Sequence, residues 1–160
     1  MGTGKTSVGK ILARRLKKTA RDVDEFIEAK EKRSIRDIFE KDGEAYFRRA
    51  EKEAIRAISR EENVVITTGG GAVLDPENRK ALSGSGWIVA LHASPETIFK
   101  RVKNSKRRPL LQGEDMLSEI KKLLEIRKPF YNQADFSLDT DGKNTAQVTG
   151  MILRTLKEKL

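Results

Sequence analysis

The sequence contains no cysteine and only one histidine, His92. Disulfide bonds, a thiolate nucleophile and zinc sites built on cysteine are therefore excluded, as is a metal site made of several histidines. No apolar run approaches the roughly 20 residues that span a bilayer, and the N-terminus shows no charged-then-apolar signal segment. These features favour a protein of a soluble, reducing compartment, and we expect it in the cytoplasm.

Aromatic residues are scarce, at 6% of the chain, whereas positive charge is abundant. Lysine and arginine total 33 against 24 acidic residues, which gives a net charge of +9 over 160 residues. Such a surplus raises the question of nucleic acid. Because the basic residues are scattered over amphipathic segments and the aromatic residues are too few for a base-stacking platform, we favour a small anionic ligand.

Residues 1–6, Met-Gly-Thr-Gly-Lys-Thr, match the second part of the phosphate-loop pattern G-x-x-x-x-G-K-[ST]. Glycines let the backbone curl around phosphate oxygens, Lys5 adds positive charge at the outer phosphates, and the Thr6 hydroxyl is a ligand type for Mg²⁺. Apolar residues at helical spacing from Val8 to Leu16 predict a helix directly after the loop, with its N-terminal dipole toward the anion. A simple glycine-rich turn is the alternative interpretation.

The buried strand that ordinarily leads into a phosphate loop would fall before Met1, as would the first glycine of the pattern. We therefore expect further residues upstream in the physical protein. Residues 17–21 are too polar to form a good buried strand. An intact mass equal to 18.0 kDa would reject the expectation of upstream residues.

Helices and short apolar strands alternate along the rest of the chain. We expect strands at residues 64–66, 87–91 and 136–138, and helices beginning at Ser34, after Gly43, at Ser94, near Leu117 and near Val148. Gly43 interrupts the helix that begins at Ser34, and Gly69-Gly70-Gly71 closes the first apolar strand in a tight backbone site. Residues 103–115 are basic and poorly periodic, which predicts a mobile loop. Strands separated by helices predict a single three-layer α/β domain over residues 1–160, with a mainly parallel sheet.

Two further groups of polar residues suggest phosphate chemistry. If this segment is extended, the side chains of Asp22 and Asp24 point to the same side. One carboxylate would then bind the waters around Mg²⁺, and the other would contact the molecule that accepts the phosphoryl group. A surface turn or a helix cap is the alternative for this Asp-x-Asp pattern. Arg108 lies at the edge of the basic loop, where an arginine stabilises charge that develops during phosphoryl transfer. Arg127 lies near a helix end, where interaction with the helix dipole is the alternative.

Taken in this order, these segments resemble the shikimate kinases along nearly the whole chain. The resemblance is carried by the phosphate loop, Asp22-Val23-Asp24, residues 34–48, Thr68-Gly69-Gly70-Gly71-Ala72-Val73, Arg108-Pro109-Leu110-Leu111, Arg127-x-Pro-x-Tyr131 and Asp139-Thr140-Asp141. It implies a P-loop kinase fold of the nucleoside-monophosphate-kinase type with a five-stranded parallel sheet, whose first strand is missing from this sequence. The phosphate loop would span residues 1–7, a helical shikimate-binding region about residues 25–60, and a lid about residues 103–115.

The resemblance also implies an activity and a set of residue roles. The reaction is ATP-dependent phosphorylation of the shikimate 3-hydroxyl to shikimate 3-phosphate in aromatic amino acid biosynthesis, with Mg²⁺ as cofactor and a monomeric enzyme. The resemblance implies that ATP binds to Gly2, Thr3, Gly4, Lys5, Thr6, Ser7, Arg101 and Arg108. It implies that shikimate binds to Asp24, Arg48, Gly70 and Arg127, and that Mg²⁺ binds to Thr6 and Asp22. The implied catalytic residues are Lys5, Asp24 and Arg108. Arg48 and Arg127 would hold the shikimate carboxylate, a task suited to a planar guanidinium.

Two other classes of function stay open from the sequence. Another P-loop kinase, acting on gluconate or a nucleotide, would keep the phosphate loop and lid but gives no reason for Asp24, Arg48, the three glycines and Arg127 together. A basic nucleic-acid-binding domain would explain the charge but not the phosphate loop.

Arg108→Ala is expected to lower turnover far more than it weakens shikimate binding, because the arginine would act on charge that develops during transfer. Steady-state kinetics test this expectation. A change confined to the KM for shikimate would contradict the role.

Overall fold

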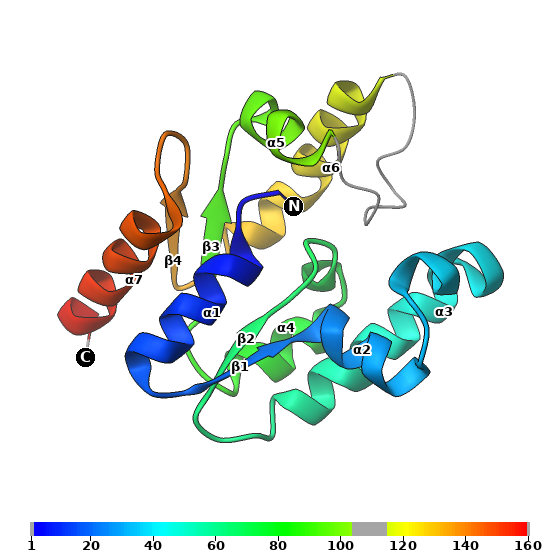
Figure 1. Ribbon diagram of the computed structural model, residues 1–160, viewed down its shortest axis with the longest axis horizontal. Helices are drawn as coiled ribbons and strands as arrows, with labels where there is room; N and C mark the ends of the chain where they lie inside the picture. Colours follow the sequence, from blue (N-terminus) through cyan, green and yellow to red (C-terminus); the bar gives the residue numbers. More distant parts are fainter. Residues whose placement is uncertain (1, 104–114, 160) are drawn as a thin grey trace.

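Four short strands form two separate parallel pairs in the computed structural model, which describes residues 2–103 and 115–159 (Figure 1). The strands are β1 (Thr19–Asp22), β2 (Val64–Thr67), β3 (Val89–His92) and β4 (Phe136–Asp139). The helices are α1 (Lys5–Leu16), α2 (Val23–Glu31), α3 (Ile35–Ile58), α4 (Pro76–Ser83), α5 (Pro95–Val102), α6 (Met116–Tyr131) and α7 (Thr145–Lys159), and a short 3-10 helix, η1 (Ala72–Leu74), follows β2.

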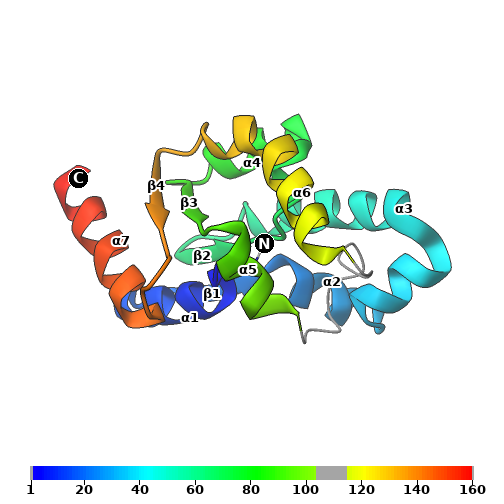
Figure 2. The same cartoon turned by 90° about the horizontal axis from the view of Figure 1, so that it is seen from above.

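β1 pairs with β2 and β3 pairs with β4, in registers that begin with Thr19 opposite Val64 and Val89 opposite Phe136. The predicted parallel pairing of strands is thus confirmed. Helices cover both faces of the strands, since α1 lies on one side of them and α4 on the other when the molecule is seen from above (Figure 2). Over the described ranges, however, β2 and β3 share no ladder. The described strands therefore form two separate parallel pairs rather than one continuous ladder.

Several boundaries differ from the prediction for identifiable reasons. β3 begins at Val89 rather than at residue 87, because Trp87 is 46% exposed and the Ile88 amide donates to the Asp135 side chain at 2.6 Å. The residue pattern alone predicted neither α2 nor α4, although the resemblance places most of α2 in a helical region. Each begins after an aspartate, Asp22 or Asp75, whose carboxylate accepts hydrogen bonds from amides of the first turn. β1 is largely exposed, as the polarity of residues 17–21 predicts.

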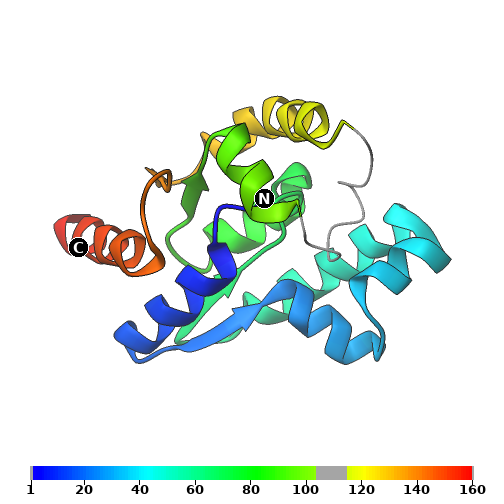
Figure 3. The same ribbon diagram turned by 45° about the horizontal axis from the view of Figure 1, so that its top comes forward.

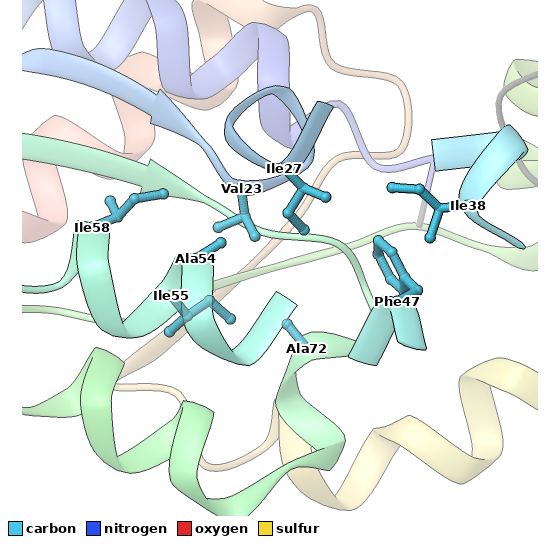
Figure 4. Packing of buried hydrophobic residues seen from close by; sticks show 8 residues of the cluster. All are labelled: Val23, Ile27, Ile38, Phe47, Ala54, Ile55, Ile58 and Ala72. Carbon is cyan, nitrogen blue, oxygen red and sulfur yellow. The ribbon is translucent and has the colours of Figure 1, made fainter. Parts of the chain in front are cut away.

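The main core joins α2 and α3 to the segment after β2. Its buried members, shown in Figure 4, are Val23, Ile27, Ile38, Phe47, Ala54, Ile55, Ile58 and Ala72. A second cluster packs α1 on α7 through Val8, Leu12, Val148 and Ile152, and a third joins α5 to α6. α2 and the first half of α3 extend at the end of the molecule opposite α7 (Figure 3). Among the described residues no helix has the length and apolar character needed to cross a bilayer.

The predicted capping box at Ser34 is confirmed. The Ser34 hydroxyl accepts a hydrogen bond from the Asp37 amide at 3.1 Å, and the Asp37 carboxylate accepts one from the Ser34 amide at 3.2 Å. The predicted interruption is confirmed as well, because Gly43 has a φ of 78° and kinks α3 between two helical parts. Arg48 and Glu51 lie in the second helical part, after the kink.

Ser34→Ala is expected to lower the free energy of unfolding by about 1 kcal/mol, because one cap acceptor of α3 is lost. Urea unfolding measures the change. Ser83→Ala is the matched control: its hydroxyl donates to the Lys80 carbonyl near the end of α4, so we expect an effect within about 0.5 kcal/mol. Equal effects of the two substitutions would contradict the importance of the capping box.

Candidate active site

The turn before α1 is shaped as an anion cradle. Gly4 precedes the helix with a φ of 87°, in the left-handed region that side chains other than glycine rarely adopt. Gly4 provides no side-chain cap for the first turn of α1, and this turn is the positive end of the helix dipole, which favours an anion. Thr3 is buried just before this turn, and Gly2 packs against Val102 of α5.

Asp22 connects the phosphate loop to the ends of β1 and β2. Its Oδ2 atom accepts hydrogen bonds from the hydroxyls of Thr6 at 2.9 Å and Thr67 at 2.7 Å. Its Oδ1 atom accepts from the amides of Asp24 at 3.0 Å and Glu25 at 3.2 Å, which caps α2. The cap interpretation of Asp22 is therefore correct. Of the two alternatives for this segment, the extended one does not hold, because Asp24 lies in the first turn of α2.

The oxygen atoms of Thr6 and Asp22 suit a magnesium ion bound together with a phosphate substrate. Mg²⁺ prefers oxygen ligands, keeps several waters and takes only one or two protein groups beside substrate phosphates. In residues 2–103 and 115–159 no group of three or more His, Asp or Glu side chains could hold a metal by itself. A hydroxyl and a carboxylate beside an anion cradle fit a nucleotide-bound magnesium better than a resident metal.

A second group of polar side chains gathers where β2 ends, and we call it the acceptor corner: Asp24 of α2, Arg48 and Glu51 of α3, Gly69-Gly70-Gly71 after β2, and Arg127 and Tyr131 of α6. Arg48 donates to Glu51 at 2.7 Å and to Glu44 at 2.9 Å. A Cβ atom on Gly71 would lie 2.7 Å from Nη2 of Arg48, so a side chain at this position would displace the guanidinium from where it now lies.

Glycine also brings the backbone close to the carboxylates of the corner. A Cβ atom on Gly69 would lie 3.2 Å from Oε1 of Glu51 and 3.6 Å from Oδ1 of Asp24. The Tyr131 hydroxyl donates to the Gly70 carbonyl at 2.7 Å, which fixes the glycine segment against α6. The predicted tight backbone site is thus confirmed. The glycine segment thus brings its backbone close to the Arg48 guanidinium and to the carboxylates of Glu51 and Asp24.

Charge inside the acceptor corner is balanced but largely removed from water. Glu51 is 1% exposed and Arg127 is 4% exposed. Burial raises the pKa of the Glu51 carboxyl, and the nearby Asp24 charge raises it further, while Arg48 and Arg127 oppose the shift. Burial also raises the pKa of the Tyr131 hydroxyl, although Arg127 opposes this shift. Two guanidinium groups and two carboxylates therefore share a poorly hydrated space.

Arg101 of α5 joins the phosphate loop to the end of β4. Its guanidinium donates to the hydroxyl and the carbonyl of Thr140, each at 3.1 Å, and to the Gly2 carbonyl at 3.4 Å. The Ser94 amide, at the start of α5, donates to Asp141. These contacts place Arg101 beside the phosphate loop.

Comparison with known proteins decides the family. A family model described as shikimate kinase matches residues 1–157. The chain belongs to the shikimate kinase family. A shikimate kinase of Hahella chejuensis is 46% identical over 158 residues, which cover 98% of this chain and 82% of the relative. One of Caldicellulosiruptor saccharolyticus is 49% identical over 141 residues, which cover 88% of this chain and 82% of the relative.

Solved structures of the shikimate kinase family share the fold. The shikimate kinase of Acinetobacter baumannii in complex with shikimate matches with a TM-score of 0.97 at 35% identity, covering 99% of this chain and 89% of that chain. The Aquifex aeolicus shikimate kinase matches with a TM-score of 0.87 at 40% identity, covering 99% and 93%. The P-loop kinase α/β fold and an ATP-dependent kinase are therefore confirmed. Family membership also decides against the gluconate-type, nucleotide-type and nucleic-acid-binding alternatives as the primary function.

The structure brings together most of the residues predicted for the site. Asp24, Arg48 and Arg127 meet beside the glycine segment, and Thr6 meets Asp22. Because Arg127 is buried within α6, which continues to Tyr131, the helix-dipole alternative does not fit. Ser7 is exposed on the first turn of α1. Arg108, together with residues 104–114 of the predicted lid, lies outside the described residues.

Three residues of the site were missed from the sequence. Glu51 lies among charged residues of α3, and its only signal was the i, i+3 spacing from Arg48. Tyr131 stood in the motif after Arg127 without an assigned role, and its contact with Gly70 joins segments distant in sequence. Thr67 gave no signal, because its bond to Asp22 depends on the pairing of β1 with β2.

Glu51→Gln is expected to raise the KM for shikimate about tenfold, because Arg48 loses the charge that holds it in the corner. The KM for ATP should stay unchanged. Steady-state kinetics with each substrate varied separately measure the difference. Glu53→Gln on the same helix is the matched control, since the Glu53 side chain is 64% exposed and pairs with Lys30 at the surface. An equal rise in both KM values would contradict a positioning role for Glu51.

Proposed function

We propose that this protein transfers the γ-phosphoryl group of ATP to the 3-hydroxyl of shikimate, giving shikimate 3-phosphate and ADP. The observation that carries the proposal is the position of Asp22, which holds Thr6 of the phosphate loop and the Asp24 amide at the acceptor corner. The nucleotide site and the acceptor site are thus neighbours joined by one carboxylate. This arrangement suits direct transfer between two bound substrates.

The acceptor corner has the groups that shikimate requires. Arg48 and Arg127 offer guanidinium groups to the substrate carboxylate, and a planar fork binds a carboxylate through two charged hydrogen bonds. Asp24 accepts from substrate hydroxyls, and the Gly70 amide offers a donor. Because Glu51 already pairs with Arg48 in a buried position, it holds the guanidinium ready for the substrate.

Transfer forms a bond between the shikimate hydroxyl oxygen and the γ-phosphorus and breaks the bond from that phosphorus to the ADP oxygen. Asp24 orients the hydroxyl and accepts its proton as the bond forms. The loop amides and Lys5 bind the phosphates. Thr6 and Asp22 would hold Mg²⁺, which when bound neutralises charge on the phosphate oxygens.

Three further assignments belong to the same proposal. Arg101 borders the nucleotide, because it contacts the phosphate loop at Gly2. Arg108 stabilises charge on the transferred group, on the sequence grounds given above. The monomeric state and the cytoplasmic location stay predictions from the sequence.

A coupled assay of ADP release tests the substrate directly. We expect turnover with ATP and shikimate that is at least about a hundredfold above that with gluconate or any nucleoside monophosphate, because only shikimate pairs with all groups of the corner. A higher rate with gluconate or a nucleotide would contradict the proposal.

A further inference from the structure

The three glycines of the acceptor corner continue directly into η1. Two backbone hydrogen bonds make the glycines and η1 one unit: the Ala72 amide donates to the Gly69 carbonyl at 3.3 Å, and the Leu74 amide donates to the Gly71 carbonyl at 3.0 Å. A displacement of η1 would therefore move the glycine backbone with it. Whatever holds η1 in place also holds this side of the corner.

Two neighbouring side chains of α4 bind all three carbonyls of η1. Asn78, which is 2% exposed, donates from Nδ2 to the Ala72 carbonyl at 3.1 Å. Arg79 donates from Nη1 to the Val73 carbonyl at 2.6 Å and to the Leu74 carbonyl at 3.2 Å. A 3-10 helix of three residues satisfies few of its own carbonyls, so the position of η1 depends on these donors.

Arg79 also contacts α6, which forms the other side of the corner. Its guanidinium carbon lies 4.8 Å from the centre of the Phe130 ring, which is a cation–π geometry. The next residue, Tyr131, donates its hydroxyl hydrogen bond to the Gly70 carbonyl at 2.7 Å, and Arg127 lies about one helical turn before it. One side chain thus joins the segment that carries Gly70 to the helix that carries Arg127.

The start of α4 is fixed to α3, the third element of the corner. Lys52 of α3 pairs with Asp75, the N-cap of α4, at 2.9 Å and with Glu77 at 3.1 Å. Lys52 directly follows Glu51, which belongs to the corner. Because α4 is attached to α3 in this way, Arg79 has a fixed support from which to hold the glycine segment and α6.

We propose that Arg79 is a positioning residue for the binding of shikimate: it holds the glycine segment against α6 and thereby sets the separation of the Gly70 amide from the Arg127 guanidinium. The inference rests on the proposed function, in which both of these groups bind shikimate. Because Arg79 contacts the carbonyls of η1 and the Phe130 ring, it acts through these neighbours. Its loss misplaces groups that bind the acceptor and leaves the phosphate loop unchanged.

Steady-state kinetics of Arg79→Met, with each substrate varied separately, test the proposal. Methionine keeps an unbranched apolar side chain but carries no charge and donates no hydrogen bond. We expect the KM for shikimate to rise about tenfold and the KM for ATP to stay within about twofold. Lys80→Met, at the next and exposed position of α4, is the matched control and should leave both KM values within about twofold.

A double-mutant cycle with Tyr131→Phe tests whether Arg79 acts on the same segment as Tyr131. The phenylalanine lacks the hydroxyl that binds Gly70. If both residues hold one segment, either loss releases it. When each single variant raises the KM for shikimate about tenfold, the double variant should then raise it less than about thirtyfold. Independent effects would multiply to about a hundredfold and overturn the proposal.

Phe130→Leu is a second variant, which decides the proposal if Arg79→Met does not fold, as judged by its Tm. It removes the ring but leaves the hydrogen bonds to η1, so we expect a rise of about threefold in the KM for shikimate alone. Unchanged KM values in these variants, or equal rises in both, would overturn the inference, while normal turnover by wild-type protein would leave the proposed function intact. A wild-type protein without shikimate-dependent release of ADP would overturn both.

Discussion

Asp24→Asn lowers kcat for shikimate phosphorylation by about 10²–10⁴-fold, the range for loss of a general base, while the KM for shikimate changes by less than about threefold. The amide keeps the size and a hydrogen-bond acceptor but cannot take the hydroxyl proton. The backbone contact of Asp24 with Asp22 is independent of the side chain, so α2 keeps its cap. Steady-state kinetics with saturating ATP measure the effect.

Glu25→Gln is the control for this substitution. Glu25 is the next residue of α2, pairs with Lys10 at 2.7 Å, and is 59% exposed, so loss of its charge should leave kcat within about twofold. If Asp24→Asn instead raised the KM for shikimate and left kcat unchanged, Asp24 would bind the acceptor without serving as its base. That result would contradict the proposed proton transfer.

Arg127→Gln raises the KM for shikimate about a hundredfold and leaves the KM for ATP unchanged. The loss corresponds to about 2.7 kcal/mol, within the range for charged hydrogen bonds in a desolvated site. Arg127 is 4% exposed and its Nε atom has no hydrogen-bond partner among the described residues, so it has donor capacity to offer a ligand. Lys128→Gln, at the next and exposed position of α6, is the control.

The methyl ester of shikimate separates a carboxylate contact from a general loss of structure. Wild-type protein should prefer the acid over the ester by at least about tenfold, because the ester offers no charge to the guanidinium groups. The Arg127→Gln variant should lose most of this preference. An unchanged ratio of acid to ester in a variant that still folds, as judged by its Tm, would contradict the assignment.

Local signals in the sequence predicted much of the fold. Ser34 and Ser94 cap α3 and α5 as expected, and the apolar spacing along α1, α6 and α7 identified those helices. α4 was missed although Asp75-Pro76 carries the same signal as Ser94-Pro95, because its sequence Pro-Glu-Asn-Arg-Lys is polar and shows little periodicity. The sequence left the conformation of Asp22-Val23-Asp24 open between an extended segment and a cap, since Asp22 is both the last residue of β1 and the N-cap of α2.

The site could be predicted residue by residue but not as a set of contacts. A phosphate loop follows from its own six residues, because the loop is local. The acceptor corner unites α2, α3, the segment after β2 and α6, and these contacts arise only when the chain folds. Burial of Glu51 is the clearest case, since it lies in a run of charged residues and is still 1% exposed. Its neighbour Glu53, on the same helix, remains at the surface.

A crystal structure of this protein with shikimate bound is the most direct test of the acceptor corner. We predict the shikimate carboxylate within hydrogen-bond distance of Arg48 and Arg127, with a ring hydroxyl on Asp24. The competing place is a cavity of about 350 Å³ lined by His92, Lys121 and Lys128, where lysines could attract a carboxylate. Shikimate in that cavity, with the corner empty, would contradict the account.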